Sequence, residues 1–502
     1  MKQLDSDICY RALQTRDSRF DGRLFVGVTS TGIYCRPICP ARTPHLKHCR
    51  FFPTAAAAQE AGFRACLRCR PEISPELACS RGTSNSVSRA LALIAEGFLD
   101  REDGNVEALA TRVGMGARQL RRLFEQHLGA SPVAVAQTRR VLFAKQLIHD
   151  TGLSMAEVAM ASGFGSLRRF NDTFRTLYHR PPRELRRRKN RSAPDAPAVA
   201  PVMLRMSYRP PYAWEEMLTY LTARAIDGME LVEHGIYHRT VSHEGEHGTV
   251  AVEHVPDRNT LVAAIRFPSV CALHMIATRV RHVFDVGADV NTITSHLAKD
   301  HTLAPLIASR PGLRSPGCWG GFELAVRAVL GQQITVEAAR QLGSRLVLLC
   351  GNPIHHSADP RLARAFPSPH RVASADLSRI GMPQSRRATL RALALAAVSN
   401  PRLFEPLHSI EDNIAQLRAI RGIGPWTAQY IALRALRDPD AFPVMDTGIL
   451  RGASSFDGVV PTAPQLIQRA EAWRPWRAYA AQYLWTADRH TIHKPRETRH
   501  AE

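Results

Sequence analysis

Four cysteines near the start of the chain form two close pairs. Three residues separate Cys35 from Cys39, and two residues separate Cys66 from Cys69. Two short-spaced pairs joined by a longer loop are typical of a tetrahedral zinc site with four thiolate ligands. A domain this small has little core, so a zinc ion would supply much of its folding free energy. The sequence therefore predicts one Zn²⁺ per chain, and buried or incidental thiols are the alternative.

A second candidate for chemistry is Asp446, which follows a glycine-containing turn between two expected helices. The turn runs from Gly422 to Pro425 and reads Gly-Ile-Gly-Pro. Glycine permits backbone angles closed to other residues, and proline suits the first position of a helix. Free N–H groups at such a helix start can bind one DNA phosphate without reading the base sequence. We therefore expect Gly422 and Gly424 to bind phosphate and Asp446 to reach the nucleotide; a tight turn with a surface aspartate is the alternative.

The hairpin and its downstream aspartate resemble the helix-hairpin-helix superfamily of DNA glycosylases. Further segments extend the resemblance to the AlkA-type 3-methyladenine DNA glycosylases II, over about residues 204–489. These segments are Tyr208–Trp214, Arg310–Cys318, Ala328–Ile334, Gly381–Pro383 and Arg474–Tyr479. The resemblance implies a monofunctional hydrolase that cleaves the N-glycosidic bond of alkylated purines, such as 3-methyladenine and 7-methylguanine, and leaves abasic sites.

The same resemblance implies roles for individual residues. Asp446 matches a carboxylate that stabilises the sugar cation and orients or deprotonates the attacking water. A pocket rich in π electrons would favour a cationic alkylated base over a normal one. The residues at the matching aromatic positions are Trp426, Tyr220, Tyr430 and Trp485, with core packing as the alternative. Gln333 matches the side chain wedged into DNA from which the base has been flipped.

Some positions differ from the pattern of the superfamily. Trp426 stands where the lyases of the superfamily carry a lysine, so we expect hydrolysis without a Schiff base. No cysteine follows Cys350, so an iron–sulfur cluster is not expected. Thr447 and Gly448 replace a bulky pair of the founding AlkA-type member. These two residues support one alternative: a DNA-binding transcriptional regulator with a catalytically degenerate glycosylase domain.

The four-cysteine region resembles the N-terminal domain of the Ada methylation-repair regulators, in Thr31–Pro37 and Ala61–Cys69. The resemblance implies that all four cysteines bind zinc and that Cys35 accepts a methyl group from a methylphosphotriester of DNA. Only a thiolate is nucleophilic, and zinc keeps the thiol deprotonated. The candidates for phosphate contacts, with solvated arginines as the alternative, are Arg36, Arg64, Arg68 and Arg70.

Between these two parts, one pattern recurs after about fifty residues, in which a small residue and a turn glycine precede an arginine-rich helix. The two copies contain Ala110 with Gly114 and Ala159 with Gly163. The segment is similar to AraC-type DNA-binding domains, which carry two helix-turn-helix units. The expected recognition helices are about 117–124 and 166–177. The candidates for base or backbone contacts, with plain solvation as the alternative, are Arg118, Gln119, Arg122, Arg168, Arg169 and Asn171.

The elements that position these residues belong to several domains, because 502 residues are too many for one core. The expected fold class is multidomain, mainly α with α+β parts. We expect an Ada-type zinc-binding methyl-acceptor domain, an AraC-type double helix-turn-helix, an AlkA-type N-terminal α/β domain with a small antiparallel sheet, and a helix-hairpin-helix glycosylase domain. The expected ranges are 1–80, 81–191, 204–315 and 316–495, with a linker rich in proline and alanine at 192–203.

The net charge of +21 and the pI near 10.2 are typical of a protein with a polyanionic partner. No stretch reaches a transmembrane length and the N-terminus lacks an apolar signal core, so we expect a cytoplasmic protein without a membrane partner. The expected partners are double-stranded DNA, both alkylated and promoter DNA, and RNA polymerase.

Taken together, the chain resembles an Ada-type sensor fused to an AlkA-type enzyme. The leading hypothesis is a DNA glycosylase of alkylation repair that also senses methylphosphotriesters and regulates transcription in the adaptive response. Methylation of Cys35 would favour promoter binding. An AraC-type regulator with an unrelated small-molecule ligand is a further alternative, which the sequence around the four cysteines disfavours.

Overall fold

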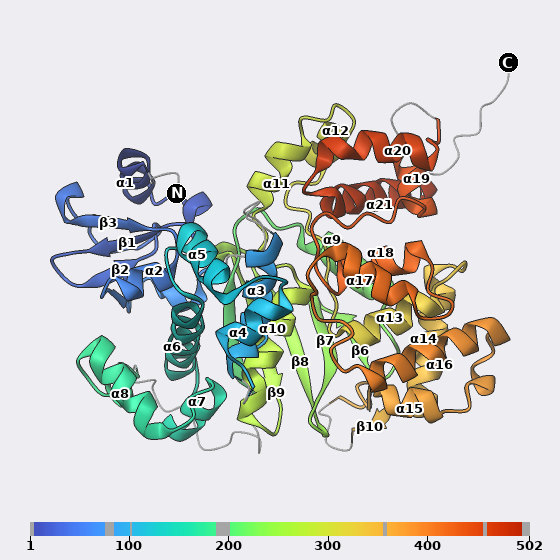
Figure 1. Cartoon of the computed structure of the whole chain (residues 1–502), viewed down its shortest axis with the longest axis horizontal. Coiled ribbons are helices and arrows are strands. Elements are labelled where there is room, and N and C mark those ends of the chain that lie inside the picture. Colours follow the sequence, from blue (N-terminus) through green and yellow to red (C-terminus); the bar gives the residue numbers. More distant parts are fainter. Residues whose placement is uncertain are drawn as a thin grey trace.

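A computed structural model of the chain describes residues 5–75, 85–100, 103–186, 201–354, 359–454 and 459–493. The domain with the four cysteines, called the zinc domain below, lies at the left of Figure 1 and the helix-turn-helix segment beside and below it. The large sheet lies in the centre, and the helices of the last domain lie at the right. Residues 192–200 of the predicted linker fall outside the described residues, and a strand begins at Val202, before the predicted end of the linker. A search of the described helices finds none that is long and apolar enough to span a membrane.

The zinc domain is a small sheet with helices beside it. Its elements are α1 (Ser6–Gln14), β1 (Phe25–Val28), β2 (Ile33–Cys35), β3 (Cys49–Phe52), α2 (Ala55–Glu60) and β4 (Arg64–Ala65). The strand order is β3-β1-β2-β4, and β2 pairs in parallel with β4. In that register Tyr34 lies opposite Ala65. Cys35 and Cys66, the next residues along the two strands, are therefore brought together.

The helix-turn-helix segment consists of α3 (Asn85–Ala95), α4 (Val106–Arg112), α5 (Ala117–Leu128), α6 (Pro132–Asp150), α7 (Met155–Ala161) and α8 (Leu167–Tyr178). Helices α4 and α5 form one unit, α7 and α8 form the second, and α6 connects them. The turn residues Gly114 and Gly163 have φ of +77° and +75°, a left-handed conformation that favours glycine. The two predicted recognition helices correspond to α5 and α8.

The third domain contains a five-stranded antiparallel sheet of order β5-β9-β8-β7-β6. Its elements are β5 (Val202–Ser207), α9 (Trp214–Thr222), β6 (Glu230–Glu233), β7 (Ile236–His243), β8 (Glu246–Val255) and β9 (Thr260–Arg266). Three helices follow: α10 (Leu273–Val283), α11 (Val290–Leu297) and α12 (Leu303–Ser309). The strands expected from the alternating residues around 250–267 are present as β8 and β9.

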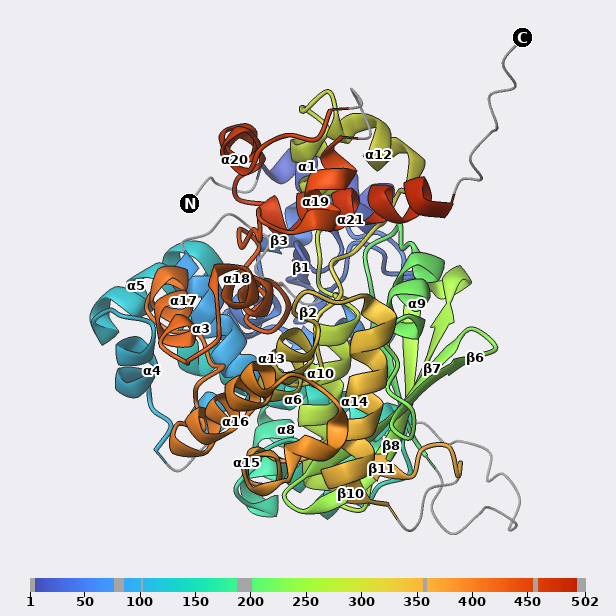
Figure 2. The same cartoon turned by 90° about the vertical axis from the view of Figure 1, so that its right-hand side faces the viewer.

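The last domain is helical apart from a short pair of strands, β10 (Asn352–Pro353) and β11 (Arg364–Ala365). Its helices are α13 (Gly321–Leu330), α14 (Val336–Cys350), α15 (Pro369–Ser374), α16 (Gln384–Ser399), α17 (Ile410–Arg418), α18 (Pro425–Arg434), α19 (Thr447–Ala453), α20 (Ala463–Ala470) and α21 (Arg477–His493). Figure 2 shows α18 between an upper group with α19 and α21 and a lower group with α13, α14 and α16.

One apolar core extends through three of the domains. It contains Phe25 of the zinc domain, Val141 of α6, Phe174 of α8 and Leu261 of the sheet, all in a single cluster of buried side chains. The first helix-turn-helix unit has its own core. The helices of the last domain have a further core and share another with α11 and α12. The predicted domains are therefore packed together rather than strung along the chain.

Candidate functional site

The four predicted zinc ligands come together in space. Their sulfur atoms all lie within 4.8 Å of one another, a spacing that one tetrahedral zinc ion can bridge. Cys39, Cys66 and Cys69 are buried, whereas Cys35 is partly exposed. The backbone N–H of Arg36 donates to Cys69 Sγ at 3.3 Å, which favours an anionic sulfur. The donor set fits one Zn²⁺ held by four thiolates.

The contacts among the four thiols shift their pKa values in opposite directions. The pKa of Cys39 falls to about 7, chiefly because its sulfur accepts a hydrogen bond from Cys35. The same partner lowers the pKa of Cys66. The pKa of Cys35 is raised, because its thiol is the donor in these contacts. A bound zinc ion supplies the positive charge that lets all four sulfurs be thiolates together.

Two buried cations hold the loop that carries Cys66 and Cys69. Lys145 of α6 donates to the carbonyl of Cys66 at 2.9 Å, and Arg36 donates to the carbonyl of Cys69 at 3.1 Å. Lys145 is fully buried and forms an ion pair with Glu72. Because α6 joins the two helix-turn-helix units, the zinc loop is bound directly to the DNA-binding segment.

The expectation that four arginines near the cysteines contact phosphates is wrong for two of them. Arg36 is 4% exposed and forms an ion pair with Asp21. Arg70 pairs with Glu72 at 2.9 Å and with Asp150 at 2.8 Å. Both guanidinium groups therefore stabilise the fold. Arg68 is exposed and Arg64 is partly exposed, so these two remain candidates for phosphate contacts.

Asp446 is the N-cap of α19 and is held from several directions. Its Oδ1 accepts the backbone N–H groups of Gly448 at 2.9 Å and Ile449 at 3.1 Å. The indole Nε1 of Trp485 donates to Oδ1 and that of Trp426 donates to Oδ2, each at 2.8 Å. These donors and the helix N-terminus stabilise a negative charge at a partly exposed position.

The four predicted aromatic residues form one cluster beside Asp446. The rings of Trp426 and Tyr430 stack with centroids 5.4 Å apart, and Trp485 meets Tyr430 edge-on at 6.2 Å. The hydroxyl oxygen of Tyr220 lies 3.3 Å from that of Tyr430. Tyr220 is buried, but the other three rings are partly exposed. We call these four residues the aromatic cluster, and its members come from α9, α18 and α21.

The hairpin between α17 and α18 contains the predicted glycine turn, and phosphate binding there remains a prediction. Gly422 has φ of +87°, and a Cβ there would lie 1.9 Å from Thr389 Oγ1. Gly424 is the N-cap of α18 and Pro425 occupies its first turn, without a side-chain cap. The N–H groups at this helix start face no capping side chain and are suited to an anion.

The turn after α13 carries the predicted wedge, Gln333. This residue is exposed and adopts a left-handed conformation with φ of +57°, which is uncommon for a residue other than glycine. Its neighbour Gln332 donates from Nε2 to the carbonyl of Gly422 at 3.1 Å and to Thr427 Oγ1 at 3.0 Å. Gln332, which the sequence did not single out, therefore ties the wedge turn to the hairpin.

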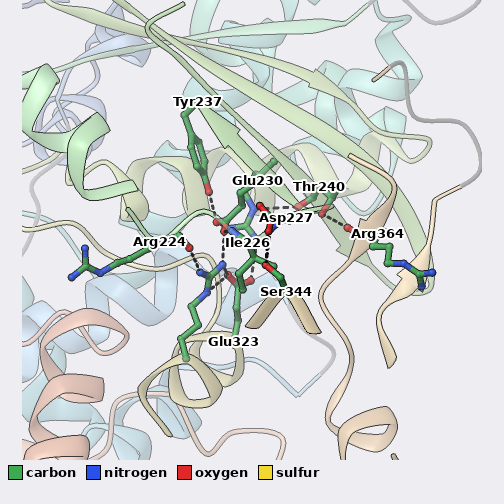
Figure 3. Close-up of polar contacts among 11 residues, drawn as sticks. Arg224, Ile226, Asp227, Glu230, Tyr237, Thr240, Glu323, Ser344 and Arg364 are labelled. Carbon is green, nitrogen blue, oxygen red and sulfur yellow. Dashed lines mark hydrogen bonds and ion pairs between the residues drawn. The ribbon is translucent and has the colours of Figure 1, made fainter. Parts of the chain in front are cut away.

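A buried polar network, which the sequence also did not predict, attaches α13 to the sheet domain (Figure 3). Glu230 accepts hydrogen bonds from Tyr237 Oη and from Arg327 Nη2, each at 2.6 Å. Arg327 also donates to the carbonyl of Arg224 at 2.8 Å. The Arg224 guanidinium lies 4.1 Å from the ring centroid of Tyr220. The network therefore fixes one side of the aromatic cluster.

The six predicted DNA-reading residues lie on α5 and α8. Five are exposed and Asn171 is partly exposed. On α5, Arg121 pairs with Glu107 at 2.7 Å, and on α8 the guanidinium of Arg168 lies 3.9 Å from the Asp172 carboxylate. Contact of these six residues with bases remains a prediction.

Comparisons with known proteins match each part of the chain. Four family models match: the metal binding domain of Ada at residues 8–72, a helix-turn-helix domain at 109–188, the AlkA N-terminal domain at 203–320 and the HhH-GPD superfamily of base excision DNA repair proteins at 326–478. A "probable bifunctional transcriptional activator/DNA repair enzyme AlkA" of Mycobacterium tuberculosis is 40% identical over 98% of both chains.

Other relatives match either the C-terminal glycosylase part or the N-terminal Ada-like part of the chain. The DNA-3-methyladenine glycosylase 2 of Escherichia coli is 33% identical over 56% of this chain and 96% of its own length. The bifunctional transcriptional activator/DNA repair enzyme Ada of Escherichia coli is 33% identical over 32% of this chain and 43% of its own length. The 3-methyladenine DNA glycosylase of Archaeoglobus fulgidus, with 20% identity and a TM-score of 0.51, matches 58% of this chain and 99% of its own and shares the fold.

Proposed function

We propose a function for this chain from the premise that it belongs to the family of bifunctional transcriptional activators and DNA repair enzymes in which an Ada-type zinc domain and helix-turn-helix precede an AlkA-type glycosylase. The chain is a DNA alkylation repair protein: a DNA glycosylase of the 3-methyladenine type, joined to a zinc-cysteine methyl acceptor and a helix-turn-helix regulator. Both reactions act on DNA, at two sites that lie in different domains of the chain.

The observation that carries the glycosylase assignment is the position of Asp446 between two indole N–H groups. As the bond between C1′ and the base nitrogen breaks, the sugar gains positive charge that a fixed carboxylate stabilises. Water then bonds to C1′ and loses a proton, and we assign Asp446 as the acceptor of that proton. The indole rings that fix the carboxylate also offer π surfaces to a flipped alkylated purine. Trp426 replaces the lysine that a lyase reaction would need, so the product is an abasic site.

The structure also gives a role to Gly448, one of the two residues that favoured a degenerate domain. Its N–H donates to Asp446, and a Cβ there would lie 3.1 Å from both Asp446 Oδ1 and the Trp485 ring. A small residue at this position is therefore compatible with a functional carboxylate. This supports an active enzyme over a degenerate binding module.

The test is release of 3-methyladenine from methylated duplex DNA by the wild type and by Asp446→Asn. We expect the single-turnover rate to fall by about 100-fold or more, because the charge that stabilises the sugar cation is lost. Asp257→Asn, at an exposed aspartate of the sheet domain, is the matched control and should keep the wild-type rate. Equal release by the wild type and Asp446→Asn would remove Asp446 from the mechanism.

At the N-terminal site, Cys35 is the acceptor that we propose, because it is the partly exposed member of the four cysteines. Zinc, held by Cys35, Cys39, Cys66 and Cys69, supplies thiolate character when bound. The Cys35 sulfur bonds to the methyl carbon of a methylphosphotriester while the O–CH₃ bond breaks, and the phosphate oxygen keeps the electron pair. The S-methyl product is not regenerated, so each chain accepts one methyl group.

Mass spectrometry after incubation with methylated DNA should show this single methyl group on the wild type and none on Cys35→Ser. Cys271 is an exposed cysteine outside the cluster, so Cys271→Ser should still be methylated. If Cys35→Ser accepted a methyl group, another cysteine would be the acceptor.

For regulation, methylation of Cys35 removes one negative charge from the four-cysteine site, and Lys145 binds the Cys66 carbonyl of that site to α6. A less negative surface is repelled less by the DNA backbone, so promoter affinity should rise. We propose the cytoplasm as the location and RNA polymerase as a partner. The transcriptional activators among the relatives support the second proposal, and a polymerase pull-down with promoter DNA tests it.

A further inference from the structure

A buried arginine lies beneath the aromatic cluster. Arg434, the last residue of α18, is 1% exposed. Its guanidinium carbon is 4.9 Å from the ring centroids of both Tyr220 and Trp485 and 5.8 Å from that of Tyr430. One cation therefore faces three of the four rings on which a flipped base would stack.

Hydrogen bonds keep this guanidinium in place. Nη1 of Arg434 donates to the carbonyl of Pro316 at 2.8 Å, and Nη2 donates to Gln482 Oε1 at 2.8 Å. Neither partner carries a negative charge, so they orient the cation without neutralising it. The positive charge remains available to the rings above it.

The two tyrosines of the cluster share a hydrogen bond. Their hydroxyl oxygens are 3.3 Å apart, and Arg224 adds a second guanidinium 4.1 Å from the Tyr220 centroid. Burial alone would raise the pKa of Tyr220, but the charges of Arg434, Arg224 and Arg327 lower it below its ordinary value of 10.0. Burial raises the pKa of Tyr430 to about 12. Tyr220 therefore gives up its proton more readily than Tyr430, and either hydroxyl can be the donor in the hydrogen bond between them.

We propose that Tyr430 donates a hydrogen bond to the departing base, and that Tyr220 and Arg434 position and polarise its hydroxyl group. The proposal rests on the glycosylase function assigned above. Tyr430 is the partly exposed residue of the two tyrosines, and its ring stacks on that of Trp426, whose indole N–H binds Asp446. A base whose sugar lies at Asp446 is therefore next to the Tyr430 ring.

The chemistry of the departing base explains what this hydroxyl can contribute. The electron pair of the broken bond stays on the base. A cationic alkylated purine becomes neutral and needs no proton, whereas a neutral base becomes an anion. Tyr430 can give its proton to an acceptor atom of that anion, Tyr220 replaces it, and water reprotonates Tyr220. Since the attacking water releases one proton, the overall reaction is the addition of one water molecule.

The proposal predicts a leaving-group dependence that a structural role would not produce. Single-turnover rates are measured on two duplexes, one with 7-methylguanine as the cationic base and one with hypoxanthine as the neutral base. Tyr430→Phe and Tyr220→Phe keep both rings and remove one hydroxyl each. We expect both variants to lose about 10-fold or more on hypoxanthine and to stay within about threefold of the wild type on 7-methylguanine. Tyr10→Phe removes a hydroxyl that binds the Pro44 carbonyl in the zinc domain and should change neither rate.

Equal losses on both bases, or no loss on hypoxanthine, would overturn the proposal while leaving the glycosylase function intact. A wild type that released 7-methylguanine but no hypoxanthine would also overturn it. Release of neither base by the wild type would instead contradict the glycosylase function itself.

A pH profile on hypoxanthine tests Arg434 separately. The rate should fall at alkaline pH as Tyr220 loses its proton. The charged groups that face Tyr220 are Arg434, Arg224 and Arg327. Arg434→Gln removes one cation, so the pKa of Tyr220 rises and the alkaline fall should move to higher pH. Arg434→Lys keeps the charge, so the alkaline fall in rate should stay near the pH at which it occurs in the wild type. An unchanged profile in a folded Arg434→Gln protein would exclude the role of Arg434.

Discussion

At the scale of single residues, hydrogen bonds fix the orientation of the Asp446 carboxylate. Four donors from α18, α19 and α21 bind its two oxygens, and two of these donors are the indole groups of the aromatic cluster. The residues that would hold the base therefore also orient the acid beside the sugar. Such orientation before the reaction is a large source of rate enhancement in enzymes.

This arrangement predicts that Trp426 acts through its N–H as well as through its ring. Trp426→Phe keeps an aromatic surface but removes the donor to Asp446 Oδ2, which frees one oxygen to rotate. We expect the single-turnover rate on 3-methyladenine to fall by about 10-fold, the equivalent of one hydrogen bond of about 1.4 kcal/mol. Trp476→Phe, in the core below α21, is the matched control. An unchanged rate in Trp426→Phe would show that Trp426 contributes stacking alone.

The residues of the site differ in how far the sequence predicts them. Asp446, Trp426, Tyr430 and the four cysteines stand in short motifs, whereas Tyr220 and Trp485 were expected only from the family resemblance. The structure brings the aromatic residues together and also the four cysteines. Arg434 and Gln332 were not predicted, because an arginine at the end of a helix and a glutamine in a turn resemble surface residues. Their roles depend on partners about a hundred residues away in the sequence, such as Pro316 and Gly422. The motif predicted that Arg36 contacts DNA, but Arg36 is buried and forms an ion pair with Asp21 instead.

At the scale of elements, the hairpin between α17 and α18 depends on the space around Gly422. We predict that Gly422→Ala lowers stability by about 1–3 kcal/mol, because φ is +87° and the added Cβ would strike Thr389. Nonspecific DNA affinity should fall as the loop shifts. At Gly424, φ is −84° and a Cβ meets open space, so Gly424→Ala should keep both properties. Urea unfolding and DNA titration measure them; equal stability of the two variants would contradict the role of the turn.

Helix α10 predicts a pH dependence of stability. Burial lowers the pKa of His274 well below 6.5, and Arg139 adds to the effect; burial lowers that of His282 to about 3. Unfolding lets both rings take up protons below pH 6.5, so their contribution is present above that pH and is lost as the pH falls toward the folded values. The free energy of unfolding should decrease by up to about 1.4 kcal/mol per pH unit for each ring.

Urea unfolding at pH 7 and pH 5 checks this prediction. His282→Gln should show a smaller decrease between the two pH values than the wild type. His370 is exposed, so His370→Gln should show the same decrease as the wild type. If all three proteins lost equal stability, α10 would not be the source of the pH dependence.

The elements themselves were predictable where the chain repeats a pattern over many residues. The recurring helix-turn-helix motif and the helical spacing around the hairpin predicted α5, α8, α17 and α18. The zinc-domain strands are only two to four residues long, too short for alternation to show. Their arrangement comes instead from pairing across the loop, such as β2 with β4, which the sequence does not reveal.

At the scale of the whole molecule, the sequence predicts separate domains, whereas three of them share a core. Periodicity shows which face of an element is apolar, but not which distant element covers it. Phe143 of α6 packs edge-on against His274 of α10 with centroids 5.0 Å apart. The backbone carbonyl of Asp21 accepts a hydrogen bond from Arg209 Nε at 2.9 Å. These contacts join the sensor half to the glycosylase half.

The shared core leads to a prediction about zinc and the distant half of the chain. The six tryptophans all lie at or after residue 214, so their fluorescence reports on the glycosylase half alone. Removal of zinc by a chelator should nevertheless lower the midpoint of the fluorescence transition on heating, because loss of the metal destabilises the zinc domain and with it the common core. Cys39→Ala, which lacks one ligand, should begin at the lower midpoint and respond little to the chelator. A fluorescence transition that stays in place while zinc is released would mean that the two halves unfold independently, despite the hydrogen bond and the apolar contacts between them.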